Sequence, residues 1–381
     1  MRKRLSLFLL LFLLAGCAGK APSPALSTAT TAPATLAPSA TATFVPTASL
    51  TPTDSLFATA MALRTPPALP GVFQTSLQNP VDPPHTYISD TCQYLQDKWS
   101  SNNSVPGTTL VAIMFHSISE TIGSGGRYIS ASDFQTMMKA LLAHGFTAIN
   151  MTQAQAFLYH NARIPPLSVL LIVDDRPGPD TFNLYFRPYW EKYQWPVVSA
   201  WISTPLNTPE QWQTQAGLAT GGFVDLQAHG VVHNIPMWPG VSDSYIMGEL
   251  QGSIDAFKLH FNKVPIAIIW PGGGFSTHSV QIARQLGYQL GFTTSARGPV
   301  LFNWVPLGDK VTPVHGPSWQ PEGPMNDPLL LLPRYWDTDI VRHLDTIVQI
   351  SQQAAAYDQK NKVTEEEYYD IVCAPTLGPL P

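Results

Sequence analysis

The chain has 381 residues, enough for one large domain or two ordinary ones. Its residues are 44% hydrophobic but only 12% charged, about half the charged share that is usual in soluble proteins. The net charge of −5 at pH 7 argues against a nucleic-acid-binding protein, and three cysteines are too few for a disulfide scaffold or a cysteine-rich zinc module.

The first residues resemble a bacterial lipoprotein signal peptide. Residues 2–4 are basic and residues 5–15 are apolar, a run too short to span a bilayer as a mature helix but typical of a secretory signal. The run ends in Leu14-Ala15-Gly16-Cys17, which resembles a lipobox. The resemblance implies a signal peptide over residues 1–16 and a lipid on Cys17 that anchors the protein to the extracytoplasmic face of a membrane. The alternative is an ordinary cleaved signal with an incidental cysteine.

A tether is predicted after this signal. Most of residues 21–60 are Ala, Pro, Ser or Thr, and Asp54 is the only charged residue among them. Such a composition cannot bury enough apolar surface to offset the entropy of ordering, so we expect residues 17–84 to form a disordered stalk. Folded structure is expected from about His85. Outside the cytosol Cys92 and Cys373 could form a disulfide, although two unrelated buried thiols fit the sequence equally well.

Strand and helix patterns alternate through the rest of the chain. In chain order, the predicted strands lie at 109–115, 147–150, 168–173, 197–202, 224–228, 267–270 and 291–294. The predicted helices between them lie at 130–144, 153–159, 187–193, 244–261 and 279–286. The pattern predicts an α/β fold, an irregular (β/α) barrel of about seven parallel strands over residues 85–345. The alternative, a doubly wound sheet, lacks a glycine-rich phosphate loop after its first strand.

The C-terminal region is predicted to be a helix and a tail over residues 346–381. The helical pattern begins near residue 339 and is expected to end near residue 356. The acidic run at 365–367 is interpreted as solvated surface.

Polar side chains follow four of the predicted strands. They are His116 after the first strand, Asp174 and Asp175 after 168–173, His229 and His233 after 224–228, and the segment 271–275 after 267–270. Because the carboxyl ends of barrel strands meet on one rim, these side chains are expected to lie close together. Two imidazoles and one carboxylate form a three-ligand face for a divalent metal, and an adjacent carboxylate can accept a proton from water. The alternative is a helix-capping Asp pair and ordinary loop histidines.

Two other kinds of metal site fit less well. A zincin protease helix reads His-Glu-x-x-His, but Gly230 stands where the glutamate would be. A non-haem iron oxygenase also uses two histidines and one carboxylate, but in another order along an all-β fold.

In these motifs the chain resembles the polysaccharide deacetylases of carbohydrate esterase family 4, over about residues 110–337. Residues 169–182 (VLLIVDDRPGPDTF) resemble the first family motif, 224–234 (VDLQAHGVVHN) the second, and 268–276 (IIWPGGGFS) the third. Residues 113–120 (IMFHSISE) and 331–337 (LLPRYWD) are similar to the opening and closing strands of the membrane-associated branch.

The resemblance implies a role for each matching residue. Asp175, His229 and His233 would hold a divalent metal, zinc first, with cobalt, nickel or manganese as alternatives. Asp174 would be the general base, and His116, or else His315, would protonate the departing amine. The predicted substrate-binding residues are Arg176, Trp270, Pro271, Gly273 and Phe275, and Trp238 or Trp319 could stack on sugar rings.

Three positions depart from the family pattern. Arg176 replaces a small residue, Ile269 replaces the arginine that steadies the catalytic carboxylate, and Gly230 replaces a hydroxyl residue and so is expected to loosen the metal loop. No predicted ligand is lost. The resemblance implies a hydrolase that removes N-acetyl groups from N-acetylglucosamine-type units of a cell-wall or extracellular polysaccharide. The alternatives are an O-acetyl polysaccharide esterase and a non-catalytic sugar-binding lipoprotein.

Overall fold

The computed structural model describes residues 64–311 and 320–381. The predicted signal peptide, Cys17 and most of the predicted tether therefore lie outside the described residues, as do His315 and Trp319. Across the two described stretches, no helix is both long enough and apolar enough to cross a membrane.

Seven parallel strands form a curved sheet, as predicted. From one edge to the other they are β10 (Leu290–Phe292), β9 (Ala267–Ile269), β8 (Val224–Ala228), β7 (Val197–Trp201), β6 (Leu167–Val173), β2 (Thr109–Phe115) and β13 (Tyr335–Trp336). Short strands extend it: β5 (Thr147–Ala148) is parallel to β6, and β11 (Val300–Leu301) is antiparallel to β2. Separate ribbons pair β1 (Pro84–His85) with β12 (Val305–Pro306), and β3 (Ser117–Ser119) with β4 (Tyr128–Ser130).

The order of the strands confirms the barrel and excludes the doubly wound alternative. From β6 to β10 the strands lie side by side in chain order, without the reversal that a doubly wound sheet requires. One segment connects the two edges, because Leu332 forms a parallel bridge with Phe292 and Tyr335 pairs with Ile113. The sheet is therefore an irregular (β/α) half-barrel, and the carboxyl ends of β2, β6 and β8 share one rim.

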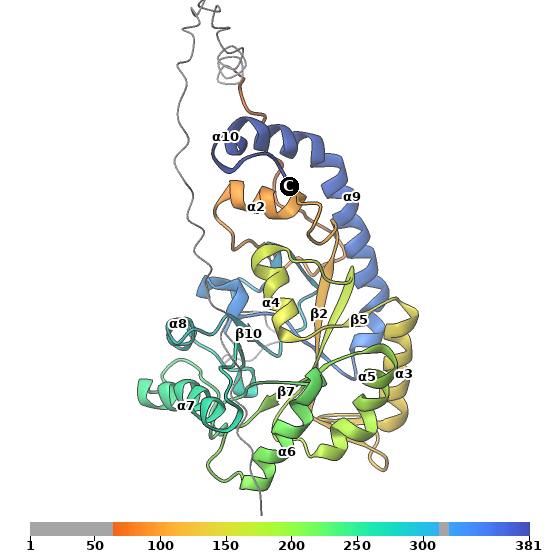
Figure 1. The fold of residues 1–381 in the computed structure, drawn as a ribbon, viewed down its shortest axis with the longest axis vertical. Helices are drawn as coiled ribbons and strands as arrows, with labels where there is room; N and C mark the ends of the chain where they lie inside the picture. The colour runs from red at the N-terminus through yellow and green to blue at the C-terminus, as the bar shows by residue number, and fades with distance from the viewer. Residues whose placement is uncertain (1–63, 312–319) are drawn as a thin grey trace, which may run out of the picture. The chain divides into compact units, whose positions relative to one another are not determined.

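Helices connect and cover these strands (Figure 1). They are α2 (Thr91–Trp99), α3 (Ala131–Ala143), α4 (Met151–His160), α5 (Arg187–Tyr193), α6 (Pro209–Ala219), α7 (Asp243–Phe261), α8 (Thr277–Gln285), α9 (Leu344–Tyr368) and α10 (Ala374–Leu377). The short helical turns are η1 (Thr181–Phe186), η2 (Thr220–Gly222), η3 (Pro271–Gly273), η4 (Gly323–Met325), η5 (Pro328–Leu330), η6 (Ile340–His343) and η7 (Tyr369–Cys373).

Local sequence explains where several helices begin. The Ser130 side chain accepts a hydrogen bond from Asp133 N and so caps α3, as the predicted helix start required. Asn150 and Gln153 form a reciprocal capping box at the start of α4, and Thr208 and Gln211 do the same for α6. These caps satisfy backbone N–H groups that the first helical turn leaves without partners.

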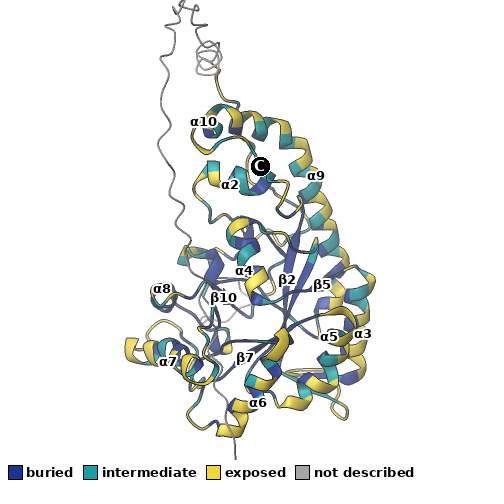
Figure 2. Cartoon of the chain, in the orientation of Figure 1, coloured by how far each residue is buried: buried dark blue, intermediate teal, exposed yellow. Residues whose placement is uncertain are grey.

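The strands are buried on both faces, whereas the outer faces of the helices are exposed (Figure 2). Alternate residues of β2 enter two different hydrophobic clusters: Leu110 and Ala112 pack with α4 and α8, and Val111, Ile113 and Phe115 pack with α3. Burial on both faces explains why the strands read as continuous apolar runs.

The two ends of the folded part differ from the prediction. Residues from Arg64 onward already lie on the domain, where the Phe73 ring packs 5.8 Å from the Trp304 ring, so the predicted boundary at His85 is too late. Helix α9 continues to Tyr368, well beyond residue 356. Its acidic run is not all solvated surface, because Glu365 is buried and paired with Lys98.

Of the two alternatives that the sequence left open for Cys92 and Cys373, the structure shows the disulfide, with the two Cα atoms 5.4 Å apart. It joins α2 to η7 beyond the end of α9, and α2, α9 and α10 gather at one end of the folded part (Figure 1). A link across 281 residues restricts the unfolded chain and so stabilises this end of the domain.

Candidate metal centre

The three predicted metal ligands lie together. Asp175 follows β6, and His229 and His233 lie in the loop after β8. His229 Nε2 lies 3.7 Å from Asp175 Oδ1, and His233 Nε2 lies 3.9 Å from the same oxygen. One possible ligand atom of each residue lies within 4.8 Å of the other two. Three such donors can share one divalent cation.

The hydrogen bonds of both histidines suit a metal site. His229 Nδ1 lies 2.7 Å from the Ile269 carbonyl oxygen and donates to it, which leaves Nε2, the atom that faces Asp175, to bind a metal. His233 Nε2 is buried and, among the described residues, has no hydrogen-bond partner, which a cation would supply. Burial and the neighbouring His229 lower the pKa of His233 to about 4, which keeps its ring in the neutral, metal-binding form at pH 7. The residues present therefore fit a divalent metal.

The backbone at Asp175 gives two adjacent carboxylates different surroundings, although His229 Nε2 lies 4.0 Å from Asp174 Oδ2 and 3.7 Å from Asp175 Oδ1. Asp175 has a φ of 76°, a left-handed conformation that is uncommon outside glycine. Flanking strands hold it, because Asp174 N donates to the Phe115 carbonyl oxygen and Ile202 N donates to the Asp175 carbonyl oxygen. As a result the Asp174 side chain is buried, whereas Asp175 faces the two histidines.

Arg127, which the sequence analysis did not single out, forms an ion pair with Asp175. It lies between β3 and β4, and its side chain is 58% exposed. Burial raises the pKa of Asp175, but the His229 imidazole and the Arg127 guanidinium outweigh burial and lower the pKa to about 2. Asp175 is therefore an ionised ligand at neutral pH.

The loop that carries both histidines is held by a buried glutamate, Glu249 of α7. Its carboxylate accepts hydrogen bonds from the backbone N–H groups of Val231, Val232 and His233, at 2.8 to 3.1 Å. Gly230 has a φ of +80°, and a Cβ atom there would collide with the Glu249 carboxylate. The expectation that Gly230 loosens this loop is therefore wrong, because the glycine allows the close approach that fixes it.

The predicted base, Asp174, has an arginine partner that the sequence analysis did not expect. Arg334 Nη1 lies 2.8 and 3.0 Å from the two Asp174 oxygens, and its Nε donates to the Thr293 carbonyl oxygen. Arg334 is fully buried. Burial raises the pKa of Asp174, but Arg334 more than compensates and the net shift is downward. Asp174 therefore has an arginine partner although position 269 is isoleucine, and this partner comes from the segment that leads into β13.

His116, the first candidate for the acid, lies on the same rim. Its Nε2 is 3.9 Å from Asp174 Oδ2, and its ring stacks on the Trp336 ring with centroids 5.3 Å apart. Burial lowers the pKa of His116, although the Asp174 and Asp175 charges act against it, so the ring is neutral at pH 7. Asp337 follows Trp336 in the chain. Burial raises the pKa of Asp337 to about 7, and the Asp174 charge contributes to a lesser degree.

The predicted substrate-binding residues are largely misplaced. Trp270 is fully buried and its Nε1 donates to the Leu330 carbonyl oxygen, and Pro271 and Phe275 are also buried. These three residues pack behind the rim instead of walling a substrate pocket, so that prediction is wrong for them. Gly273 is half-buried, with a φ of +70° and Thr294 directly against its Cα.

Two other predicted contacts remain accessible. Arg176 is exposed and its Nη1 donates to Asn207 Oδ1 at 3.2 Å. Trp238 is 39% exposed, and it follows the exposed Val232 and Ile235 along the chain. His315, the second candidate for the acid, lies outside the described residues.

The site residues that the sequence analysis missed had few local signals. Arg334 and Trp336 lie within LLPRYWD, which had been recognised only as a closing strand. Glu249 is one polar residue inside an otherwise ordinary amphipathic helix. A buried charge has no distinctive sequence pattern, because its partner lies far away along the chain.

Comparisons with known proteins agree with the fold. Residues 162–291 match a family model described as polysaccharide deacetylase. This match covers β6 to β10 and all three candidate metal ligands. No curated protein sequence matches the chain significantly. The chain therefore contains a polysaccharide deacetylase-like domain with a candidate Asp–His–His metal site.

Several solved structures are similar. The deacetylase PplD of Streptococcus pyogenes, solved with acetate, is 19% identical, with 64% of this chain and 98% of that chain covered and a TM-score of 0.48. IcaB from Ammonifex degensii is 17% identical, with 66% and 100% covered and a TM-score of 0.47. A polysaccharide deacetylase from Bacillus cereus is 17% identical, with 63% and 69% covered and a TM-score of 0.47. At these identities and scores, no residue's role is transferred to this chain.

Proposed function

We propose that this deacetylase-like domain is a metal-dependent hydrolase that removes N-acetyl groups from N-acetylglucosamine-type units of a cell-wall or extracellular polysaccharide. One observation carries the proposal: Asp175, His229 and His233 offer ligand atoms within 4.8 Å of one another, next to the buried carboxylate of Asp174. A site that only packed a loop would not need two imidazoles directed at an ionised carboxylate.

Asp175, His229 and His233 would hold the divalent metal, for which zinc is our first choice, and cobalt, nickel or manganese could use the same donors. When bound, such an ion supplies Lewis-acid polarisation of the acetyl carbonyl and of water. Asp174, ionised because of Arg334, accepts the proton of the attacking water. His116, whose Nε2 lies 3.9 Å from Asp174 Oδ2, takes up this proton and passes it to the departing amine, so that amide and water become acetate and amine and both side chains return to their starting states. Glu249 keeps the two histidines in place.

We also propose that the protein works outside the cytoplasm, anchored through a lipid on Cys17. The lipobox-like leader and the proline-rich segment after it support this location. The Cys92–Cys373 disulfide supports it independently, since such bonds persist in oxidising compartments. A stalk of this kind would let the domain reach a polymer next to the membrane.

The test is acetate release from N-acetylglucosamine oligomers by the full-length protein. We expect release to stop with a chelator and to return with added metal. His233→Ala should abolish both metal binding and acetate release, whereas His278→Ala, a change at a surface histidine paired with Asp243, should leave both unchanged. Release from O-acetylated sugars alone would favour the esterase instead. Failure of the wild-type protein to bind any divalent cation would refute both enzymes and leave a sugar-binding protein.

A further inference from the structure

A cavity, which we call the basal cavity, lies at the other end of the barrel from the candidate metal centre. Its volume is about 250 Å³. Its lining includes Thr108, directly before β2, and Asn161, before β6, whereas the metal centre lies beyond the opposite ends of these strands. The seven residues of β2 therefore separate the two sites by roughly 20 Å. The basal cavity is distinct from the proposed active site.

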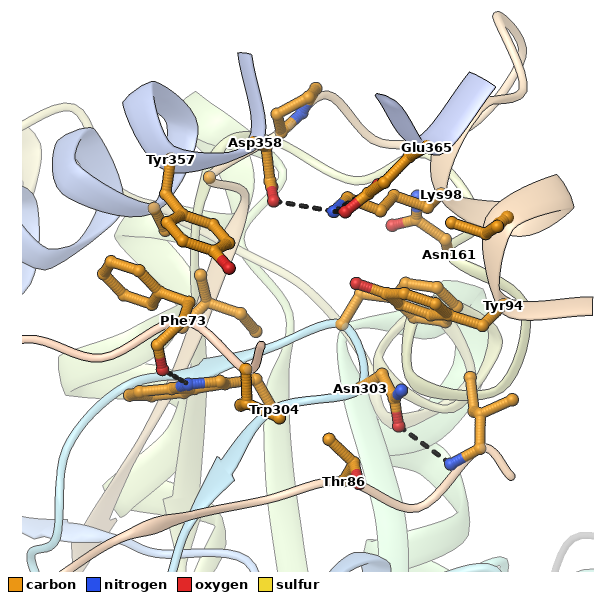
Figure 3. Close-up of a pocket in the computed structure, with 18 of the residues that line it drawn as sticks. Phe73, Thr86, Tyr94, Lys98, Asn161, Asn303, Trp304, Tyr357, Asp358 and Glu365 are labelled. Atoms are coloured by element: carbon orange, nitrogen blue, oxygen red, sulfur yellow. Dashed lines mark hydrogen bonds and ion pairs between the residues drawn. The ribbon is translucent and has the colours of Figure 1, made fainter. Parts of the chain in front are cut away.

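Aromatic rings form its two sides (Figure 3). Phe73, Trp304 and Tyr357 make one group, in which the Phe73 ring lies 5.8 Å from Trp304 and 5.6 Å from Tyr357. Tyr94 of α2 faces them from the other side, backed by the Phe302 ring at 5.8 Å. Aromatic faces so arranged suit the apolar C–H face of a sugar ring and attract a cation.

The charges at the top of the cavity in Figure 3 favour a positively charged ligand. Lys98 Nζ lies 2.8 Å from both Asp358 Oδ1 and Glu365 Oε2, so one cation faces two carboxylates and the cluster has a net charge of −1. Lys98 and Glu365 are almost fully buried, but the Asp358 side chain is 19% exposed and borders the space. An anionic ligand would be repelled by this cluster, whereas an ammonium group could pair with Asp358.

We propose that the basal cavity binds a hexosamine unit that carries a free ammonium group. Its volume is below the roughly 300–1,000 Å³ of sites for drug-sized ligands, which suits one sugar ring. Asn303 lies at the lower side in Figure 3, where its Oδ1 already accepts hydrogen bonds from the backbone N–H groups of Tyr87 and Ile88, so its amide NH2 is the group that could donate to a sugar hydroxyl. The inference rests on the proposed function in one respect, because N-deacetylation produces a hexosamine unit with a free ammonium group. The protein would thus hold deacetylated polymer while the metal centre acts on acetylated units.

The test measures binding without catalysis. Full-length protein carrying His233→Ala, kept in chelator, is titrated in a calorimeter with a glucosamine tetramer, an N-acetylglucosamine tetramer and tetralysine. We expect the glucosamine tetramer to bind about tenfold more tightly than either of the others, since only it combines a pyranose face with a cation. In the same background, Asp358→Asn and, separately, Tyr357→Ala should each weaken its binding about tenfold.

The matched control is Glu366→Gln, which removes one carboxylate from the same helix outside the basal cavity and should leave binding unchanged. Thermal unfolding shows whether Asp358→Asn or Tyr357→Ala fails to fold. If one of them does, the binding measured for the other tests the proposal. Equal binding of acetylated and free-amine tetramers, equal binding of tetralysine, or no binding by any ligand would each overturn the proposal. None of these results depends on acetate release, so the two proposals can fail separately.

Discussion

Replacing Arg334 with methionine tests the arrangement around Asp174 most directly. Arg334 is fully buried, the Asp174 side chain is 3% exposed, and the guanidinium contacts both carboxylate oxygens. Removing one partner of such a pair leaves a buried charge uncompensated, which costs about 3–5 kcal/mol. We therefore expect Arg334→Met to lower the free energy of unfolding at pH 7.5 by about that amount.

The loss of stability should depend on pH in a defined direction. In the wild-type protein Arg334 keeps the pKa of Asp174 below its ordinary value, so the contribution of the pair is complete at neutral pH and is lost only as the pH falls through that lowered pKa. In Arg334→Met, burial acts without the arginine and raises the pKa of Asp174. The variant gains stability when Asp174 becomes protonated, so the difference between the two proteins should shrink from pH 7.5 to pH 5.

Urea unfolding followed by tryptophan fluorescence, at both pH values, measures this difference. Arg342→Met is the matched control, because Arg342 is 68% exposed in its pair with Asp339, and its loss should cost less than about 1 kcal/mol. Asp174→Asn combined with Arg334→Met should recover part of the stability that Arg334→Met loses. If Arg334→Met were as stable as the wild-type protein at pH 7.5, Arg334 would not be the group that balances Asp174.

Three further predictions concern other parts of the domain. Glu249→Gln should weaken metal binding about 10- to 100-fold in a chelator competition, because the amide cannot accept all three backbone hydrogen bonds of the histidine loop. Unchanged affinity would mean that the loop keeps its conformation without Glu249. As the pH rises from 5 to 8, the wild-type protein should lose on the order of 2 kcal/mol of unfolding free energy relative to Asp337→Asn. The reason is that Asp337, with a pKa of about 7 in the folded protein, is tolerated in its buried position only while it is protonated. Parallel pH profiles of unfolding free energy for the two proteins would contradict this. Replacing both Cys92 and Cys373 with serine should cost about 2–5 kcal/mol in denaturant unfolding, and a reductant should destabilise only the wild-type protein.

The rim of candidate ligands could be predicted because two regularities act together. Buried parallel strands appear as continuous apolar runs, and in a barrel their carboxyl ends meet at one rim. Asp175 and His229, 54 positions apart in the numbering, could therefore be placed together without coordinates. The prediction that the residues after β9 contact a substrate failed because it depended on side-chain direction, which is not a local property of the chain. The rim position is visible in the sequence, but the direction in which Trp270 points depends on what packs around it.

The sequence by itself determined the α/β barrel, the start of α3 and the three candidate metal ligands, because periodicity, capping residues and strand ends are local properties of the chain. Only the tertiary structure decided that Arg334 pairs with Asp174, that Glu249 fixes the histidine loop and that Lys98, Asp358 and Glu365 form a buried cluster beside the basal cavity. Each of these arrangements joins residues from distant segments. A charge can be buried only where folding brings it a partner, and no local pattern records which partner that is.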